Sequence, residues 1–200
     1  MKNNFPPSIP PMEVPKFLEQ RSFISQFRTE EFYIFGSIES CEHYVDMITF
    51  LENAVDGEIA KIYLNTPGGH LDTAISLIHS IQNTQATVIV IAHGQVASAG
   101  TMLFFACQNR IVMPYSHFMF HDGSYGGAEQ KFNEHVKYAA ATHNLYKTMA
   151  YDFYCPYFSE DEVKEILEGK DVYLTANEMI DRIDAINNPK PVRKQRKKNA

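Results

Sequence analysis

The strongest constraint in this 200-residue chain is the run from Thr87 to Ala92, Thr-Val-Ile-Val-Ile-Ala, which is almost entirely apolar and rich in β-branched residues. A strand with one face in water alternates apolar and polar residues, whereas a strand covered on both faces is a continuous apolar run. The run therefore predicts a strand buried on both faces, as in a parallel sheet. Because it lies near the middle of the chain, segments before and after it must provide the neighbouring strands and helices.

Apolar strand patterns and helical patterns alternate around this central strand. We predict further strands at 32–35, 59–64, 110–113 and 118–120, and helices at 41–55, 71–81, 99–107, 129–154 and 160–168. This alternation predicts an α/β fold with right-handed βαβ crossovers. An apolar fraction of 44% in 200 residues is enough to bury a sizeable core, which excludes a wholly disordered chain.

The two ends differ in composition from the middle. Five of the ten prolines fall in residues 1–15, so we interpret 1–16 as an extended arm, 17–186 as the folded domain and 187–200 as a flexible tail. The last 12 residues hold six bases and no acid, which leaves −12 for the rest of a chain whose net charge is −6. An acidic body argues against a nucleic-acid-binding domain.

Hydropathy and cysteine usage narrow the class further. The chain has no apolar run long enough for a membrane span and no apolar core of a signal peptide at its start, so we expect a cytoplasmic protein without a membrane partner. Cys41, Cys107 and Cys155 lie far apart and form no Cys-x-x-Cys pair, so we expect reduced structural thiols. His117 and His121 would lie about 13 Å apart on a strand, too far to share a metal ion, and we expect neither metal nor cofactor.

A serine in a small-residue turn follows the central strand. The sequence of 94–100 is Gly-Gln-Val-Ala-Ser-Ala-Gly, and it leads into the next predicted helix. Ser98 there can be a nucleophile, helped by the unpaired N–H groups of the helix start, or it can simply cap the helix. Val96 stands where a Gly-x-Ser-x-Gly elbow has its first glycine, so this is not that motif.

A second candidate segment, Thr66-Pro67-Gly68-Gly69, follows the preceding predicted strand. Consecutive glycines after a proline form either a plain tight turn or a loop whose N–H groups are free to bind an oxyanion. Both candidate segments lie at the carboxyl ends of neighbouring strands, which is the edge where open parallel sheets bind ligands.

A histidine and an aspartate complete the candidate set. His121 ends the strand at 118–120 and is either a general base or a structural histidine. Asp122 is a poor partner for that imidazole, since strand neighbours point to opposite faces. Asp171, between a helix and a short apolar stretch, is either a surface turn residue or the group that orients the histidine.

Taken in order, these segments resemble the proteolytic subunit of the Clp protease over about residues 30–186. Residues 65–69 are similar to the family's Asn-Ser-Pro-Gly-Gly and 94–100 to its Gly-Gln-Ala-Ala-Ser-Met-Gly. Residues 114–121 resemble Pro-Asn-Ser-x-x-Met-Ile-His, and 170–178 resemble Arg-Asp-x-x-Met-Ser-Ala-x-Glu. The resemblance implies the ClpP/crotonase-like fold, in which repeated βαβ units form a head and a long handle, here about 124–154, protrudes from it.

The same resemblance implies a role for each matching residue. Ser98 would be the nucleophile, His121 the general base and then acid, and Asp171 the group that holds the imidazole. The residues implied at the oxyanion hole are Gly69 and Ala99, and those implied in substrate binding are Gly68, Gly126 and Gly127.

The family forms two stacked seven-membered rings that cleave unfolded polypeptides delivered by an AAA+ unfoldase. This chain lacks the phosphate-binding Gly-x-x-x-x-Gly-Lys-Ser/Thr sequence, so ATP use would belong to such a partner. Lys170 replaces an arginine that pairs between rings in the family. The family's Gly-Leu-Ile/Val-Asp appears here as Arg182-Ile183-Asp184, without the glycine and two residues closer to Glu178, and His121-Asp122-Gly123 replaces His-Gln-Pro. Such departures beside an intact triad suggest a remote member encoded by a bacteriophage.

Three other functions remain open at this point. A crotonase-type acyl-CoA enzyme shares the fold but needs an acid/base carboxylate beside its oxyanion hole. A structural ring subunit would have lost activity. A phage prohead protease would process scaffold proteins without an unfoldase.

Overall fold

The computed structural model describes residues 28–124 and 132–187. The elements in chain order are β1 (Thr29–Phe35), the 3-10 helix η1 (Cys41–Tyr44), α2 (Val45–Asn53), β2 (Ile59–Thr66), α3 (Leu71–Asn83), β3 (Thr87–Ala97), α4 (Ala99–Ala106), β4 (Asn109–Val112), β5 (His117–Phe120), α5 (Phe132–Tyr154), α6 (Glu160–Leu167), β6 (Val172–Thr175) and α7 (Ala176–Asn187). The α/β prediction is confirmed. Residues 1–27, 125–131 and 188–200 lie outside the described residues, so the boundaries of the predicted arm and tail stay predictions.

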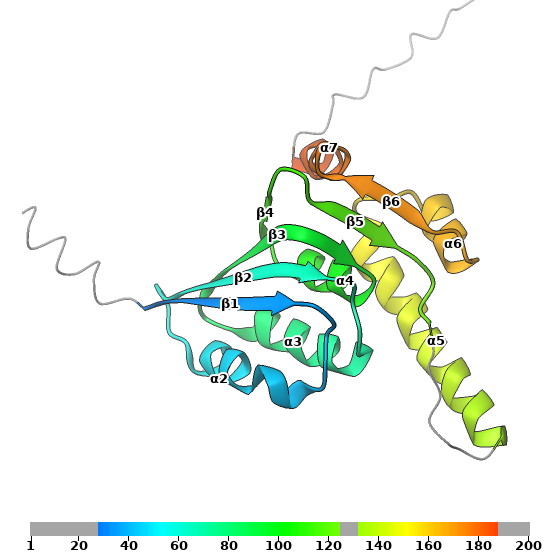
Figure 1. Cartoon of the computed structure of the whole chain (residues 1–200), viewed down its shortest axis with the longest axis horizontal. Helices are drawn as coiled ribbons and strands as arrows, with labels where there is room; N and C mark the ends of the chain where they lie inside the picture. The colour runs from blue at the N-terminus through cyan, green and yellow to red at the C-terminus, as the bar shows by residue number, and fades with distance from the viewer. Residues whose placement is uncertain (1–27, 125–131, 188–200) are drawn as a thin grey trace, which may run out of the picture.

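All the described strands belong to one sheet, in the order β1-β2-β3-β5-β6, with β4 also paired to β3 (Figure 1). The pairs among β1, β2 and β3, and those of β3 with β4 and β5, are parallel. β6 is antiparallel to β5, so the sheet is mixed rather than purely parallel. β3 is central, as its apolar run predicts, but it continues to Ala97. Residues 94–97 therefore form strand rather than loop.

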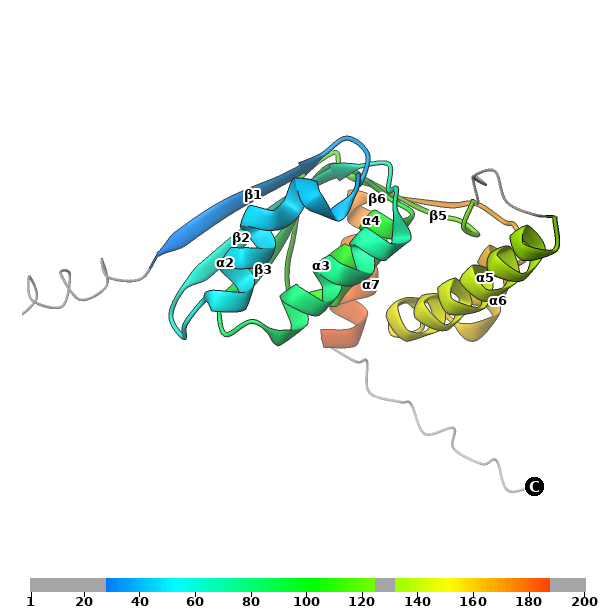
Figure 2. The ribbon, with the colours of Figure 1, turned by 90° about the horizontal axis from the view of Figure 1, so that it is seen from below.

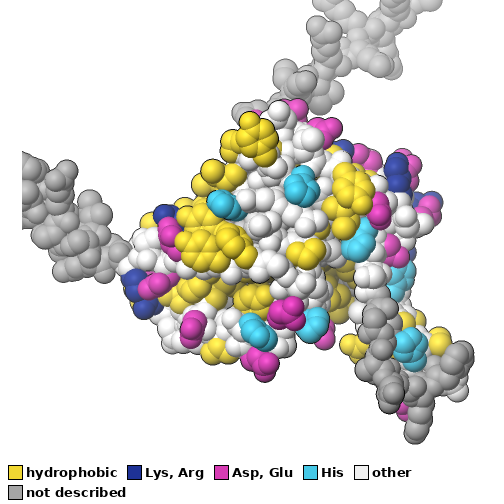
Figure 3. Space-filling model, in the orientation of Figure 1, with side chains coloured by type: hydrophobic (Ala, Val, Ile, Leu, Met, Phe, Trp, Pro, Cys, Tyr) yellow, Lys and Arg dark blue, Asp and Glu magenta, His cyan; other side chains and the backbone are white. Residues whose placement is uncertain are grey.

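The helices α2, α3, α4 and α7 cover one face of the sheet (Figure 2). Among the described elements, no helix covers the other face, so the predicted burial of β3 on both faces is only partly right. Val90 and Ala92 are completely buried and Ile91 nearly so, whereas Ile89 is half-buried. On the open face, Tyr33 stacks on Tyr63 at 4.9 Å between ring centroids. Figure 3 looks onto this face, and apolar side chains gather there over β1 and β2.

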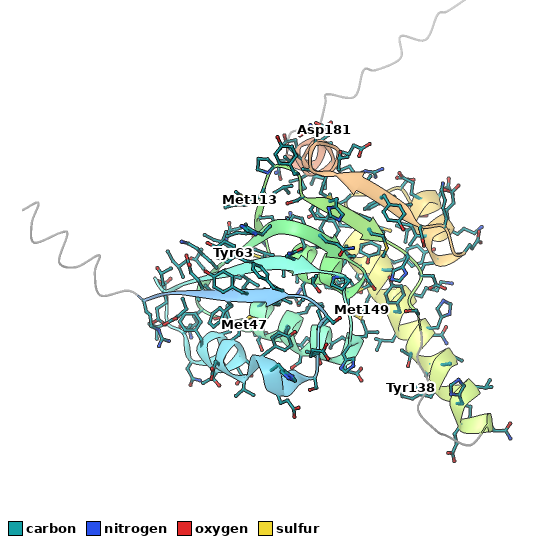
Figure 4. All side chains as sticks on the ribbon, in the orientation of Figure 1. Met47, Tyr63, Met113, Tyr138, Met149 and Asp181 are labelled. Carbon is teal, nitrogen blue, oxygen red and sulfur yellow. The ribbon has the colours of Figure 1, made fainter. Side chains whose placement is uncertain are left out.

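Helix α5 leaves the rest of the molecule, as the predicted handle does (Figure 1). Its described part begins at Phe132, and Glu129, where we predict the helix to begin, lies outside the described residues. Ala150 and Tyr154, near its C-terminal end, are completely buried against the head. Figure 4 marks its course with Tyr138 and Met149. No helix in the described part of the chain is long and apolar enough to span a membrane.

β6 and α7 close the C-terminal side of the domain, and α7 was not predicted from the sequence. Arg182 of α7 fixes this corner, since its Nη2 lies 2.7 Å from Oε1 of Glu162 and its guanidinium lies 4.3 Å from the centre of the Phe158 ring. Glu162 also accepts the backbone N–H of Ser159 at 2.8 Å and completes the N-terminal capping box of α6. Arg182, the first residue of the Arg182-Ile183-Asp184 segment, therefore ties α7 to α6.

The Glu162–Arg182 pair predicts a specific acid sensitivity. The hydrogen bond from Arg182 lowers the pKa of Glu162 from 4.5 to about 2. Because the folded state holds this carboxylate ionised, the pair stabilises the domain above pH 4.5, and the contribution is lost as the pH falls toward 2. The side chain is 40% exposed, so solvent screening limits the contribution. We expect Glu162→Gln to cost about 1 kcal/mol near neutral pH and less at acid pH.

Thermal unfolding of both proteins across this pH range measures the difference. Glu165→Gln is the matched control, because Glu165 lies on the same helix and pairs with Lys170 at the exposed surface. That variant should unfold close to the wild type at every pH. A Glu162→Gln deficit that does not shrink with acidification contradicts the assigned role of the pair.

Candidate active site

Ser98 lies in a strained turn between β3 and α4. Its φ is 53° and its ψ is −127°, a conformation that non-glycine residues rarely adopt and that is often found at functional sites. Ser98 occupies the N-cap position of α4, yet its side chain makes no capping hydrogen bond. Its backbone N–H donates to the carbonyl of Met119 on β5 at 2.9 Å. The hydroxyl is therefore not used as a helix cap, and the backbone is bonded to the strand that leads to His121.

The Pro67-Gly68-Gly69 turn packs directly against Ser98. Gly68 has φ +94°, and a Cβ built there would lie 2.7 Å from Cβ of Ser98. On either side of Gly69, the carbonyl of Gly68 accepts from the N–H of Ile38 at 2.8 Å and the N–H of His70 donates to the carbonyl of Ile38 at 2.9 Å. Because successive N–H groups of an extended chain point in opposite directions, the N–H of Gly69 points away from Ile38.

Ala99 provides a second N–H group close to Ser98. It is the first residue of α4, where backbone N–H groups have no partner within the helix. A Cβ built at Gly68 would lie 3.1 Å from the backbone nitrogen of Ala99, so the glycine turn and the start of α4 are in contact. The two residues that the family resemblance implies at the oxyanion hole, Gly69 and Ala99, thus belong to adjacent segments.

His121 follows β5 and lies in the same cavity as Ser98. The cavity is about 700 Å³ in volume. Its lining includes Ser37, Ser40, Pro67, Gly68, Gly69, His70, Ser98, Ala99, His121, Gly123, Tyr138, Thr142, His143 and Tyr146. Nε2 of His121 is buried and has no hydrogen-bond partner among the described residues. An uncompensated buried ring nitrogen is costly, so it requires a partner such as a substrate, a water molecule or the serine hydroxyl.

Asp171 stands immediately before β6, opposite His121. The antiparallel register pairs Phe120 with Val172, and continuing it by one residue places Asp171 across from His121. Directly opposed residues in an antiparallel pair project to the same face. The Asp171 side chain is exposed and does not line the cavity. The structure therefore brings Ser98, His121, Gly68, Gly69 and Ala99 to one cavity, whereas Asp171 lies outside its lining, across from His121 in the continued register.

Asp122, the other carboxylate beside His121, has a different neighbour. Its Oδ1 lies 3.3 Å from Nε2 of His143 on α5. This placement agrees with the sequence argument that Asp122 is not the partner of the adjacent imidazole. Gly126 and Gly127 lie outside the described residues, so their role in substrate binding stays a prediction. Within the described residues, no three His, Cys, Asp or Glu side chains gather as metal ligands.

The family model described as Clp protease matches residues 27–183, which is most of the chain and includes every candidate residue of the triad. The chain belongs to the Clp protease family.

Individual Clp relatives match over part of the chain. The ATP-dependent Clp protease proteolytic subunit 3 of Rhizobium johnstonii is 32% identical over 104 residues, covering 50% of this chain and 53% of the relative. Subunit 2 of Pseudomonas aeruginosa is 27% identical over 103 residues, covering 50% of this chain and 51% of the relative. The chain thus spans about half the length of the curated relatives it matches. A structure of a ClpP1 mutant from Listeria monocytogenes matches with a TM-score of 0.63 at 20% identity, over 82% of this chain and 91% of that one.

This chain thus has the fold of the Clp family. Residues that we do not predict from the sequence also contact the site. Tyr146 of α5 donates its hydroxyl to the carbonyl of His121 at 2.6 Å. Thr101 donates its hydroxyl to the carbonyl of Ser98 at 2.6 Å. The only sequence signal for Thr101 is its position three residues after Ser98, and Tyr146 has none, because its contact spans 25 residues.

Proposed function

We propose that this chain is a serine endopeptidase subunit that cleaves unfolded polypeptides with Ser98, His121 and Asp171 inside an oligomeric chamber. The observation that carries the proposal is that one cavity holds both Ser98 and His121. Ser98 lies in a strained turn and does not cap its helix, and Nε2 of His121 is buried with no partner in the described part of the chain. Membership of the Clp protease family supports the same chemistry.

The proposed reaction begins when Nε2 of His121 takes the proton from Oγ of Ser98 as that oxygen attacks the scissile carbonyl carbon. The carbonyl π electrons move to oxygen, and the N–H groups of Gly69 and Ala99 bind the resulting oxyanion. As the oxyanion collapses, the scissile C–N bond breaks, the imidazolium gives its proton to the leaving amine, and an acyl-serine remains. His121 then takes a proton from water as the water oxygen attacks the acyl carbon, and it returns that proton to Oγ of Ser98 as the ester C–O bond breaks and the acid leaves. Each fixed oxyanion donor is worth about 3 kcal/mol in such reactions.

Asp171 would act by holding the imidazole. Its carboxylate would accept the Nδ1–H of His121, fix the tautomer that leaves Nε2 free and stabilise the imidazolium. The opposed register of β5 and β6 supports this assignment, since directly opposed residues of an antiparallel pair project to the same face.

The proposal includes assembly into heptameric rings, stacked in pairs, and an AAA+ unfoldase as a partner. Two exposed apolar surfaces are available for contacts with other subunits or with the unfoldase. On α5, Val136 is 54% exposed and Leu145 is 45% exposed, while on the open sheet face Tyr33 and Phe35 are more than half exposed. Apolar surfaces of this kind are typical of interfaces. Lys170 stands where the family has an arginine that pairs between rings, but it forms its ion pair with Glu165 of the same chain. Other contacts would therefore join the rings. The proposal locates the protein in the cytoplasm, where such a partner would have ATP.

A fluorophosphonate probe tests the chemistry directly, because it phosphonylates only a serine that has been activated as a nucleophile. We expect the intact mass of the purified protein to increase by one adduct, mapped to Ser98. Ser98→Ala should give no adduct and His121→Ala should react much more slowly. A folded oligomer that gives no adduct, alone or with an unfoldase, contradicts the proposal and favours an inactive ring subunit.

Partner dependence separates this proposal from the prohead-protease alternative, which shares the serine chemistry. Degradation of an unfolded protein should require an added unfoldase and ATP if the chain works in a Clp-type complex. Cleavage of folded scaffold proteins without ATP would instead favour a bacteriophage prohead protease.

A further inference from the structure

Two tyrosines on one face of α5 reach toward the two backbone segments that carry the candidate nucleophile and base. Tyr146, Ala150 and Tyr154 are spaced by four residues, so they lie along the same side of the helix. All three are buried, with exposures of 4% or less. This face therefore joins the handle helix to the head at the active site.

Tyr146 holds the backbone of His121. Its hydroxyl donates to the His121 carbonyl at 2.6 Å, and its ring packs against Gly123, where an added Cβ would lie 3.5 Å from the ring. Burial raises the pKa of Tyr146 far above its ordinary value, so the hydroxyl remains a donor at any working pH. The residue thus fixes the end of β5 from which the imidazole projects.

Tyr154 reaches Ser98 through Thr101. The Tyr154 and Thr101 hydroxyls lie 2.7 Å apart, and the Thr101 hydroxyl lies 2.6 Å from the Ser98 carbonyl oxygen. Because a carbonyl can only accept, Thr101 uses its one hydroxyl proton on Ser98, and Tyr154 must donate to Thr101. Burial raises the pKa of Tyr154 to about 12, which keeps that proton in place. Both residues are completely buried.

The hydroxyls of Thr101 and Tyr154 help to hold the strained backbone of Ser98. A residue at φ 53° persists only where its surroundings hold it there. The Ser98 carbonyl accepts from both the N–H of Thr101, at 2.9 Å, and the Thr101 hydroxyl. A threonine hydroxyl often bonds a carbonyl three residues before it, but here Tyr154 fixes that hydroxyl from another helix.

We propose that Tyr146, Tyr154 and Thr101 are positioning residues, by which α5 sets the backbone of both Ser98 and His121 for reaction. This inference rests on the proposed function, since it assigns a role in the same chemistry. None of the three hydroxyls is required to touch the reacting atoms.

The test measures fluorophosphonate labelling of the full chain over a range of probe concentrations, which separates the maximal rate, kinact, from the affinity, KI. Thr101→Val combined with Tyr154→Phe removes both hydroxyls, so neither is left buried without a partner. Tyr146→Phe removes the third and keeps its ring. We expect each variant to lower kinact about tenfold or more, because small displacements of reacting groups have large effects on rate. The double variant should leave KI close to that of the wild type, since Thr101 and Tyr154 do not line the cavity.

Two controls separate positioning from folding. Thr101→Ser keeps the hydroxyl and removes the methyl group, and its kinact should stay within about twofold of the wild type. If Thr101 acted only by packing of its methyl group, this variant would lose activity. Tyr151→Phe removes a hydroxyl from the same helix, outside the chain that reaches Ser98, and should also react within about twofold. Circular dichroism melts show which variants are folded.

The outcomes distinguish the two proposals. If wild-type protein is not labelled at Ser98, the proposed function fails and the positioning role fails with it. If the wild type is labelled and the folded Tyr146→Phe and double variants react within about twofold of it, only the positioning role is overturned. Should the double variant fail to fold, Tyr146→Phe alone decides, since its ring still fills the same space.

Discussion

Asp171→Asn is expected to lower kcat for a fluorogenic peptide by about 10⁴-fold with little change in KM. The asparagine keeps the size of the side chain, but its amide can donate to Nδ1 of His121 and stabilise the tautomer that carries its proton on Nε2. That tautomer cannot accept the proton of Ser98. The expectation depends on the register that places Asp171 opposite His121, one residue beyond the Phe120–Val172 pair.

Asp122→Asn is the matched control for this experiment. Asp122 is adjacent to His121 in the sequence, carries the same charge and lies 3.3 Å from His143 rather than at the candidate triad. We expect this variant to keep kcat within a few-fold of the wild type. If Asp122→Asn loses activity and Asp171→Asn does not, the roles of the two carboxylates are the reverse of those proposed.

The parts of this site that could be predicted are those fixed by local sequence. The apolar run at 87–92 indicates the central strand, and the carboxyl ends of β2 and β3 bring the Pro67-Gly68-Gly69 turn beside Ser98, as the strand-end argument predicts. Parallel pairing alone is sufficient for that result, because it aligns the ends of neighbouring strands.

The remainder depends on contacts that no local pattern contains. β6 has only four residues, and its antiparallel direction is set by pairing with β5 rather than by its own composition. The hydroxyl contacts of Tyr146 and Tyr154 join positions 25 and 53 residues apart. The positive φ of Ser98 is equally invisible, since serine has no intrinsic preference for it and the surrounding hydrogen bonds impose it. The local sequence around Ser98 therefore fitted both a helix cap and a nucleophile, and only the family resemblance implied the nucleophile. The structure places Ser98 at the cap position without a capping bond.

Gly68→Ala is expected to reduce Ser98 labelling and peptide hydrolysis by at least about 10²-fold, although it adds only one methyl group. That methyl carbon would lie 2.7 Å from Cβ of Ser98 and 2.9 Å from the carbonyl oxygen of Ala97. Neither neighbour is the end of a flexible side chain, so the backbone of the nucleophile turn must shift. The same shift separates the N–H of Gly69 from that of Ala99, and misplacing one oxyanion donor already costs about 10²–10³ in rate.

A fall in activity could also come from backbone strain, because alanine at φ +94° costs stability wherever it occurs. Gly36→Ala isolates that contribution: Gly36 has φ +85°, and a Cβ there meets no atom of the described residues within 4 Å. In denaturant titrations Gly36→Ala should lose about 1–3 kcal/mol of stability from backbone strain, and Gly68→Ala should lose at least as much, because its methyl group also clashes. Only Gly68→Ala should lose activity per folded molecule, because only its methyl group pushes against Ser98. Equal activity in the two folded variants would mean that the glycine turn does not position the nucleophile.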